Sequence, residues 1–184
     1  MKWMIASDIH GSAHFCRLLM QKFADEQADR LLLLGDLLYH GPRNDLPQDY
    51  DTRETAKILN EHGNKIIAVR GNCDAQVDQA MLNFPILAEY AYLCFGDVPA
   101  FVTHGDLYNA QSLPPSLEEG ILLYGHTHVP LCREIEGVLC LNPGSVSIPK
   151  EASPHSCMTY ENGIFTWHDL EDGAYMQYPD SGVN

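Results

Sequence analysis

The sequence predicts an α/β protein in which two β-sheets pack face to face. Over the first half of the chain, apolar runs alternate with amphipathic segments, which is typical of a βαβαβ unit with parallel strands and right-handed crossovers. The second half instead contains many short apolar segments separated by turns, which favours strands with few helices. The length of 184 residues suits a single domain covering residues 1–184.

The first half contains three expected strands and two expected helices. Ser12 can cap the first helix, and Asp51 or Thr52 can cap the second, which ends near Gly63. The apolar face of the first helix is formed by Cys16, Leu19, Met20 and Phe23. Continuous apolar runs predict buried strands at residues 2–6, 31–34 and 65–69.

Turn residues separate the apolar segments of the second half. Hairpins are expected at Gly96-Asp97, Glu136-Gly137 and Asn162-Gly163, and the Asn-Gly pair is the strongest signal because it suits a type I′ turn. The polar stretch 41–50 forms a long loop after the second strand; such a stretch is more often a surface loop, but its position makes it a candidate for contact with a substrate. The expected strands cover residues 86–95, 100–103, 121–124, 131–135, 138–141, 157–160 and 164–169.

Composition limits the partners and the compartment. The net charge of −14 disfavours binding to extended nucleic acid or to an anionic membrane surface. The apolar start of the chain is too short for a signal peptide, and no run is long enough to span a membrane. The six cysteines lack CxxC spacing, which is typical of reduced thiols. We therefore expect a cytoplasmic protein, and self-association into a homo-oligomer is left open.

Metal-binding side chains follow five of the apolar runs. The carboxyl ends of strands in α/β sheets border the crevice where ligands bind, so these side chains can converge. Two Asp, four His and one Asn suit divalent ions such as Mn²⁺, Fe²⁺ or Zn²⁺, and the absence of paired thiolates disfavours a structural zinc site. Seven ligands suit two ions that share a carboxylate. The residues are Asp8, His10, Asp36, Asn72, His104, His126 and His128.

Each of these residues also has a simpler interpretation. A lone Asp after a strand is usually a cap or turn residue, and a lone His is usually a hydrogen-bonded polar group. Five such motifs at successive strand ends are much harder to obtain by chance, and the GHTH motif alone places two imidazoles two residues apart. The combination favours a metal centre.

The motifs DIH, GDLL, GNCD, THG and GHTH occur in this order and resemble those of the calcineurin-like metallophosphoesterases. The later NPGSVSIP is similar to the bacterial YfcE-type phosphodiesterase branch of that family, and the resemblance covers about residues 1–150. It implies a four-layer fold, in which helices flank a two-sheet β-sandwich, with a dinuclear metal centre. By that similarity Asp36 bridges two ions. The other ligands of the first ion are Asp8, His10 and His128, and those of the second ion are Asn72, His104 and His126.

The resemblance further implies hydrolysis of small phosphodiesters by a hydroxide shared between two divalent ions. Mn²⁺ is the expected ion, with Fe, Zn or Ni as alternatives. The expected catalytic residues are Asp36, Asn72 and His104, and a neutral Asn72 leaves the ions more charge with which to polarise phosphoryl oxygens. Arg43 and Asn44 of the loop 41–50 are candidate substrate contacts together with Asn72, since Arg suits bidentate phosphate binding, and solvation of the loop is the alternative role of Arg43 and Asn44.

Two residues depart from the family pattern. Cys73 stands where many members have a histidine thought to protonate the leaving group, so substrates with good leaving groups are expected. Asp106 stands where close relatives have a second histidine, which affects the expected affinity for substrate. Cys73 is interpreted as a packing residue, because a nucleophile would need a lowered thiol pKa. Asp74 is expected to cap the following helix, with a bond to an active-site group as the alternative.

Two other functions fit the same motifs. A phosphomonoesterase or nucleotidase would use the same metal centre, and a panel of substrates separates it from a phosphodiesterase. A scaffold of the same fold that binds protein partners, as one eukaryotic trafficking relative does, would be marked by loss of ligands. All seven ligand positions are filled here, which favours an enzyme.

Overall fold

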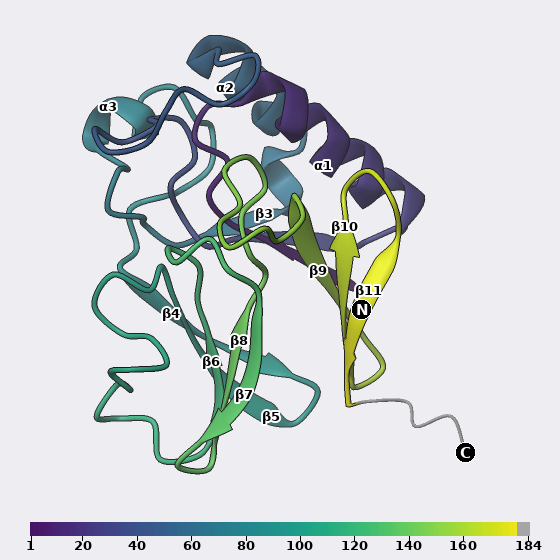
Figure 1. Cartoon of the computed structure of the whole chain (residues 1–184). Coiled ribbons are helices and arrows are strands. Elements are labelled where there is room, and N and C mark those ends of the chain that lie inside the picture. The colour runs from purple at the N-terminus through teal and green to yellow at the C-terminus, as the bar shows by residue number, and fades with distance from the viewer. Residues whose placement is uncertain (180–184) are drawn as a thin grey trace.

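The structure is a computed structural model that describes residues 1–179, in which two mixed β-sheets pack face to face (Figure 1). The strand order is β11-β10-β9-β1-β2-β3 in the six-stranded sheet and β4-β5-β6-β8-β7 in the five-stranded sheet. The predicted two-sheet α/β class is therefore confirmed. No helix in residues 1–179 is both long enough and apolar enough to cross a membrane.

The six-stranded sheet joins the two ends of the described chain. Its parallel strands β1, β2 and β3 come from the predicted βαβαβ unit, and its other strands are antiparallel. Strand β11 was not predicted, because its residues are only partly buried and show no continuous apolar run. The strands are β1 (Trp3–Ala6), β2 (Arg30–Leu33), β3 (Ile66–Ala68), β9 (Ser156–Glu161), β10 (Ile164–Asp169) and β11 (Ala174–Tyr178).

The five-stranded sheet has three parallel strands, β5, β6 and β8, with β4 and β7 antiparallel at its edges. The expected strand 86–95 was too long. Residue Ile86 is fully buried, and its backbone N–H donates to the side chain of Gln79 rather than to a strand. The strands are β4 (Tyr90–Phe95), β5 (Val98–Thr103), β6 (Gly120–Leu123), β7 (Leu131–Ile135) and β8 (Val138–Asn142).

The helices lie on the outer face of the six-stranded sheet (Figure 1). Ser12 caps α1 by accepting from the N–H of Phe15, and Asp51 caps α2 by accepting from two N–H groups, as predicted. Apolar residues of α1 and α2, such as Leu19 and Leu59, pack with Leu31 of the sheet. The helices are α1 (Ala13–Asp25), α2 (Thr52–Asn60), η1 (Gly63–Lys65) and α3 (Gln76–Gln79).

The outer face of the five-stranded sheet is covered differently. Tyr108, Leu113 and Leu117, from the segment between β5 and β6, pack against Phe101 and Leu122 of the sheet. That segment contains no helix in the described structure. The fourth layer of the expected fold is thus an irregular segment in the described structure, whose apolar side chains pack on the sheet in place of a helix.

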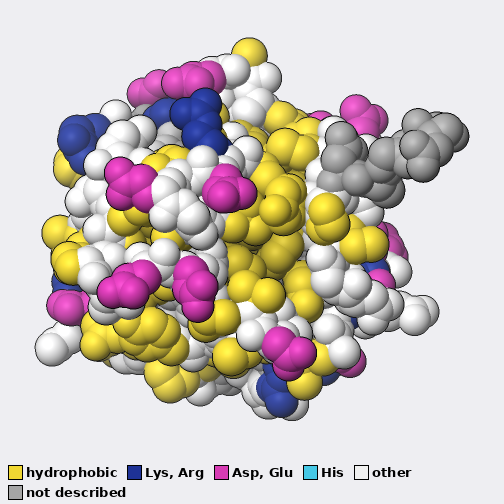
Figure 2. Space-filling model, turned by 90° about the horizontal axis from the view of Figure 1, so that it is seen from below, with side chains coloured by type: hydrophobic (Ala, Val, Ile, Leu, Met, Phe, Trp, Pro, Cys, Tyr) yellow, Lys and Arg dark blue, Asp and Glu magenta, His cyan; other side chains and the backbone are white. Residues whose placement is uncertain are grey.

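The inner faces of the two sheets form the central core, to which Ile5 and Leu32 contribute from one sheet and Val102 and Leu123 from the other. Trp167 is fully buried, and its indole N–H donates to a backbone carbonyl oxygen at 2.7 Å. At the end of the sandwich where β1 begins, this core reaches the surface. Figure 2 shows hydrophobic side chains gathered in a hollow on this lower face. A cavity of about 410 Å³ is lined by residues that include Phe95, Phe165, Leu139 and Tyr178.

Candidate metal centre

All seven predicted ligands lie at the opposite end of the sandwich, on loops that follow parallel strands. The parallel strands of both sheets end on this side, so their following loops meet. Asp8 and His10 follow β1, Asp36 follows β2, and Asn72 follows β3. His104 follows β5, and the pair His126 and His128 follows β6.

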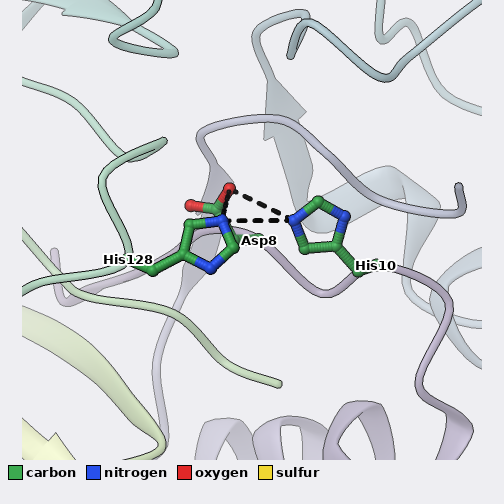
Figure 3. A group of neighbouring side chains, drawn as sticks. All are labelled: Asp8, His10 and His128. Carbon is green, nitrogen blue, oxygen red and sulfur yellow. Dashed lines mark hydrogen bonds and ion pairs between the residues drawn. The ribbon is translucent and has the colours of Figure 1, made fainter. Parts of the chain in front are cut away.

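Asp8, His10 and His128 form one compact and buried group (Figure 3). The Nε2 atoms of His10 and His128 are 3.3 Å apart, and the Oδ1 atom of Asp8 lies 3.2 Å from Nε2 of His128 and 3.6 Å from that of His10. Oδ1 of Asp8 is buried and has no partner with hydrogen-bond geometry. Buried polar atoms of this kind require a partner. Three potential ligand atoms that face one another, one carboxylate oxygen and two imidazole nitrogens, suit a metal cation.

The histidine tautomers also suit metal binding. In three of these histidines Nδ1 contacts a backbone carbonyl oxygen, which only accepts, so Nδ1 must carry the hydrogen. In the neutral ring Nε2 then keeps its lone pair and points into the site, which is how proteins commonly orient a metal-binding imidazole. The carbonyl acceptors are Tyr39 for His10 at 2.9 Å, Leu34 for His104 at 2.7 Å and Ile148 for His128 at 2.6 Å.

A second group forms around His104. Its Nε2 atom lies 3.0 Å from Oδ1 of Asn72, 3.2 Å from Nδ1 of His126 and 3.4 Å from Oδ2 of Asp36. The same oxygen of Asp36 lies 3.7 Å from Nε2 of His10 in the first group. Asp36 thus contacts both groups through one oxygen, which is the position that a bridging carboxylate requires.

The backbone at these ligands is strained. Five of the seven have φ between 48° and 63°, a left-handed conformation that residues other than glycine seldom adopt. Such strain costs about 1–3 kcal/mol per residue and concentrates at functional sites. Gly71, beside Asp36, is required for a different reason, since a Cβ atom there would overlap the Asp36 side chain. The five strained ligands are Asp8, His10, Asp36, His126 and His128.

The charges of the site call for a positive partner. Burial would raise the pKa of Asp8, yet the neighbouring His10 and His128 rings hold it well below its ordinary value. Burial likewise opposes ionisation of Asp36, but His104 lowers its pKa. Burial would lower the pKa of His104, whereas Asp36 and Asp8 raise it to about 9. Two buried carboxylates that attract protons onto neighbouring imidazoles are equally able to attract metal ions.

The role expected for Asp74 as a helix cap was wrong. Helix α3 begins at Gln76 and its N-cap is Ala75. The carboxylate of Asp74 instead accepts from the backbone N–H groups of Asp36, Leu37 and Gly71 at 2.8 to 2.9 Å. It therefore joins the loops after β2 and β3 and holds Asp36 in place, which was the alternative interpretation.

Sequence reasoning missed the residues that support Asp8 from the other sheet. The hydroxyl groups of Ser145 and Ser147 donate to the backbone carbonyl oxygen of Asp8 at 2.9 and 3.1 Å. The side chain of Asn142 donates to the carbonyl oxygen of Gly125, just before His126, at 2.8 Å. The available signal was the cluster of small polar residues in NPGSVS, which begins at the last residue of strand β8.

A cavity of about 470 Å³ opens over the ligands. It is lined by Asp36, Asn72, His126 and His128 together with the loop residues Gly41, Pro42, Arg43 and Asn44. The predicted loop 41–50 thus contacts the site, although the amide of Asn44 also donates to the carbonyl oxygen of His40 at 2.8 Å. Lys150 lines the same cavity and was not predicted, because a lysine after a turn carries no distinctive pattern.

The two departures from the family pattern differ in position. Cys73 lines this cavity, and its backbone N–H donates to Oδ1 of Asp36 at 2.8 Å. Burial and the Asp36 carboxylate raise the pKa of the Cys73 thiol, which opposes a role as a thiolate nucleophile. Asp106 is exposed and lines a neighbouring cavity instead.

Residues 1–162 match the model of the calcineurin-like phosphoesterase superfamily domain, and the chain belongs to this family. It is 44% identical to phosphodiesterase YfcE of Escherichia coli K12 over 172 residues, which are 94% of each chain. The solved structure of Yfce, a phosphoesterase from E. coli, covers 96% of this chain and 98% of its own, with a TM-score of 0.91 and 42% identity. The probable metallophosphoesterase YsnB of Bacillus subtilis is 24% identical over 90% of this chain and 88% of its own.

Proposed function

We propose that the protein is a metal-dependent phosphodiesterase that hydrolyses small phosphodiesters with good leaving groups. The observation that carries the proposal is the convergence of metal-binding atoms from five strand ends, most of them on strained backbone. Evolution retains such strain where a site needs it. The likeness to a relative named as a phosphodiesterase over nearly the full chain supports the same reaction.

In this proposal Asp8, His10 and His128 hold one divalent ion, and Asn72, His104 and His126 hold the other. Asp36 contacts both groups and serves both ions. When bound, two such ions supply a nucleophile at neutral pH and stabilise charge on the phosphoryl oxygens. Imidazole and carboxylate ligands suit Mn²⁺, which we propose as the native ion, ahead of Fe, Zn or Ni.

The chain's own residues then bind and orient the substrate. Arg43 and Lys150 bring positive charge to the cavity over the ligands, where they would hold an anionic phosphoryl group. Asn72 lines the same cavity, so we propose that it contacts substrate as well as metal. Cys73 has a raised pKa and is a poor proton donor, which leaves protonation of the leaving group to water.

We also propose that the enzyme acts in the cytoplasm and not on extended nucleic acid. All six cysteines are free thiols, which suits a reducing compartment. The net charge of −14 would repel a polyphosphate backbone beyond the site itself. The proposed substrate is therefore a small ester whose phosphoryl group is bound in the cavity of about 470 Å³ over the ligands.

A panel of substrates assayed with defined metals tests the function. Metal-depleted protein should be inactive and regain activity with Mn²⁺ more fully than with Zn²⁺ or Ni²⁺. It should then hydrolyse bis(4-nitrophenyl) phosphate faster than 4-nitrophenyl phosphate. A preference for the monoester would identify a phosphomonoesterase on the same centre. Absence of turnover with every metal and ester would favour a binding scaffold.

A further inference from the structure

A second cavity lies beside the first and shares Asn72 with it. It has a volume of about 360 Å³, and its lining includes Arg70, Tyr90, Asp106 and Tyr108. Both cavities therefore border Asn72, one of the predicted metal ligands. A phosphodiester carries two arms on one phosphorus atom. With phosphorus near Asn72, each cavity has room for one arm.

The wall of the second cavity is aromatic and braced. The ring of Tyr90 stacks on Phe101, with the centroids 5.2 Å apart and the ring planes 15° apart. Tyr108 packs edge-on against the same Phe101 ring at 5.8 Å, and Phe101 itself is buried. Tyr90 nevertheless remains 53% exposed. An exposed ring that is already held in place can stack on a planar group with little further loss of entropy.

The two cavities differ in charge. The first is lined by Arg43 and Lys150, and its one carboxylate, Asp36, is an expected metal ligand. The second is lined by two carboxylates, Glu89 and Asp106, against one cation, Arg70. The Nε atom of Arg70 already donates to the carbonyl oxygen of Asp74 at 3.1 Å. The second cavity thus disfavours an anionic group and offers acceptors to N–H and O–H donors.

We propose, on the basis of the phosphodiesterase function, that the second cavity binds an uncharged, ring-bearing arm of the substrate, such as a nucleoside. Tyr90 stacks on the ring and determines this specificity, while Glu89 and Asp106 accept from its polar groups. The other arm lies toward Arg43 and Lys150. The substrate class is therefore an asymmetric phosphodiester. Asp106, which departs from the family pattern, acts in this cavity on the neutral arm.

Three diesters with a common leaving group that has no ring test the inference. Hexafluoroisopropyl phosphodiesters with methyl, benzyl or thymidinyl as the second arm are compared by fluorine NMR of the released alcohol. The wild-type enzyme should favour the benzyl and thymidinyl esters over the methyl ester by about tenfold in kcat/KM, near the low end of base–aromatic stacking. Tyr90→Ala should lower kcat/KM for the two ring-bearing esters toward that of the methyl ester, whereas Tyr90→Phe should keep the preference.

Tyr175→Ala is the matched control. Tyr175 lies on β11 in the other sheet, is 43% exposed and does not line the second cavity. Its variant should retain the wild-type preference. The inference is overturned if wild-type enzyme shows no ring preference, or if Tyr90→Ala retains it. If the metal-loaded enzyme hydrolyses none of the three esters, the phosphodiesterase function itself fails.

Discussion

Solvent reaches the two halves of the candidate metal centre to different extents. In the inner half, formed by Asp8, His10 and His128, every side chain is buried. In the outer half, formed by Asn72, His104 and His126, only His104 is buried, and Asn72 is exposed. Only His128 of the inner half reaches the first cavity, whereas Asn72 of the outer half lines both cavities. We infer that an inner ion contributes to stability and that an outer ion meets substrate and exchanges more readily.

The largest effect is expected where the halves meet. Asp36→Asn removes the charge of the one carboxylate that contacts both groups. The metal content should fall from about two ions toward zero, and kcat/KM should fall by more than about 10²-fold, beyond the loss seen when a residue that only orients a ligand is removed. Elemental analysis and diester assays measure both. Asp45→Asn, an exposed carboxylate in the following loop, is the control. An unchanged metal content would show that Asp36 is not a ligand shared by both ions.

A pair of histidine variants distinguishes the inner half of the site from the outer half by experiment. His10→Ala leaves the carbonyl oxygen of Tyr39 without its donor, so the metal-free protein should lose about 1–3 kcal/mol in its free energy of unfolding. His126→Ala removes a partly exposed ring and should cost less than about 1 kcal/mol. Each variant should lose about one ion. Urea unfolding and metal analysis measure these effects, and equal destabilisation by both variants would contradict the comparison.

A smaller effect is expected at Cys73, on the cavity side of Asp36. If no other group donates a proton, rates should fall steeply as the leaving-group pKa rises. Cys73→His should narrow the gap between aryl and alkyl diesters by up to about 10²-fold, the low end of general-acid catalysis. Cys73→Ser provides a control of similar size. Measurement of kcat/KM over a series of leaving groups tests this, and a flat dependence in the wild-type enzyme would show that another residue is the acid.

The smallest expected effect is on the number of protons that the protein releases when it binds metal. His104, whose pKa is raised to about 9, is protonated in metal-free protein at about pH 7.5, and must lose that proton to offer Nε2 to an ion. Burial and the charge of His104 lower the pKa of His126, so its ring releases none. Metal affinity should therefore rise with pH up to about 9. Calorimetry of metal binding in two buffers measures the number of protons released. His104→Gln should release about one proton fewer than the wild-type protein, and His126→Gln should release the same number.

Much of the site could be predicted because its ligands follow strands whose type is visible in the sequence. Asp8 and His104 each come directly after an apolar run, and parallel strands place their carboxyl ends together. The contacts of Asp74 could not be predicted, because they depend on how closely the loops after β2 and β3 approach. Lys150 is likewise brought to the cavity by tertiary packing alone.

The fold was predictable to a similar degree. Buried strands such as β1 and β6 have continuous apolar sequences, and their ends were placed within one or two residues. Strand β11 was missed because an edge strand that is half exposed has no such run. The segment before Tyr90 was assigned to a strand because buried residues such as Ile86 are equally apolar in a loop.

The separation of the ligands along the chain has a consequence for folding. His10 and His128 are 118 residues apart, yet their Nε2 atoms lie within 3.3 Å. An ion held by both would act as a cross-link that closes most of the chain into one loop. Cross-links of this span reduce the entropy of the unfolded chain by an amount equivalent to about 4–5 kcal/mol, provided that they persist on unfolding. An ion instead dissociates, so its stabilising effect depends on its free concentration and becomes a property of the cell's metal supply.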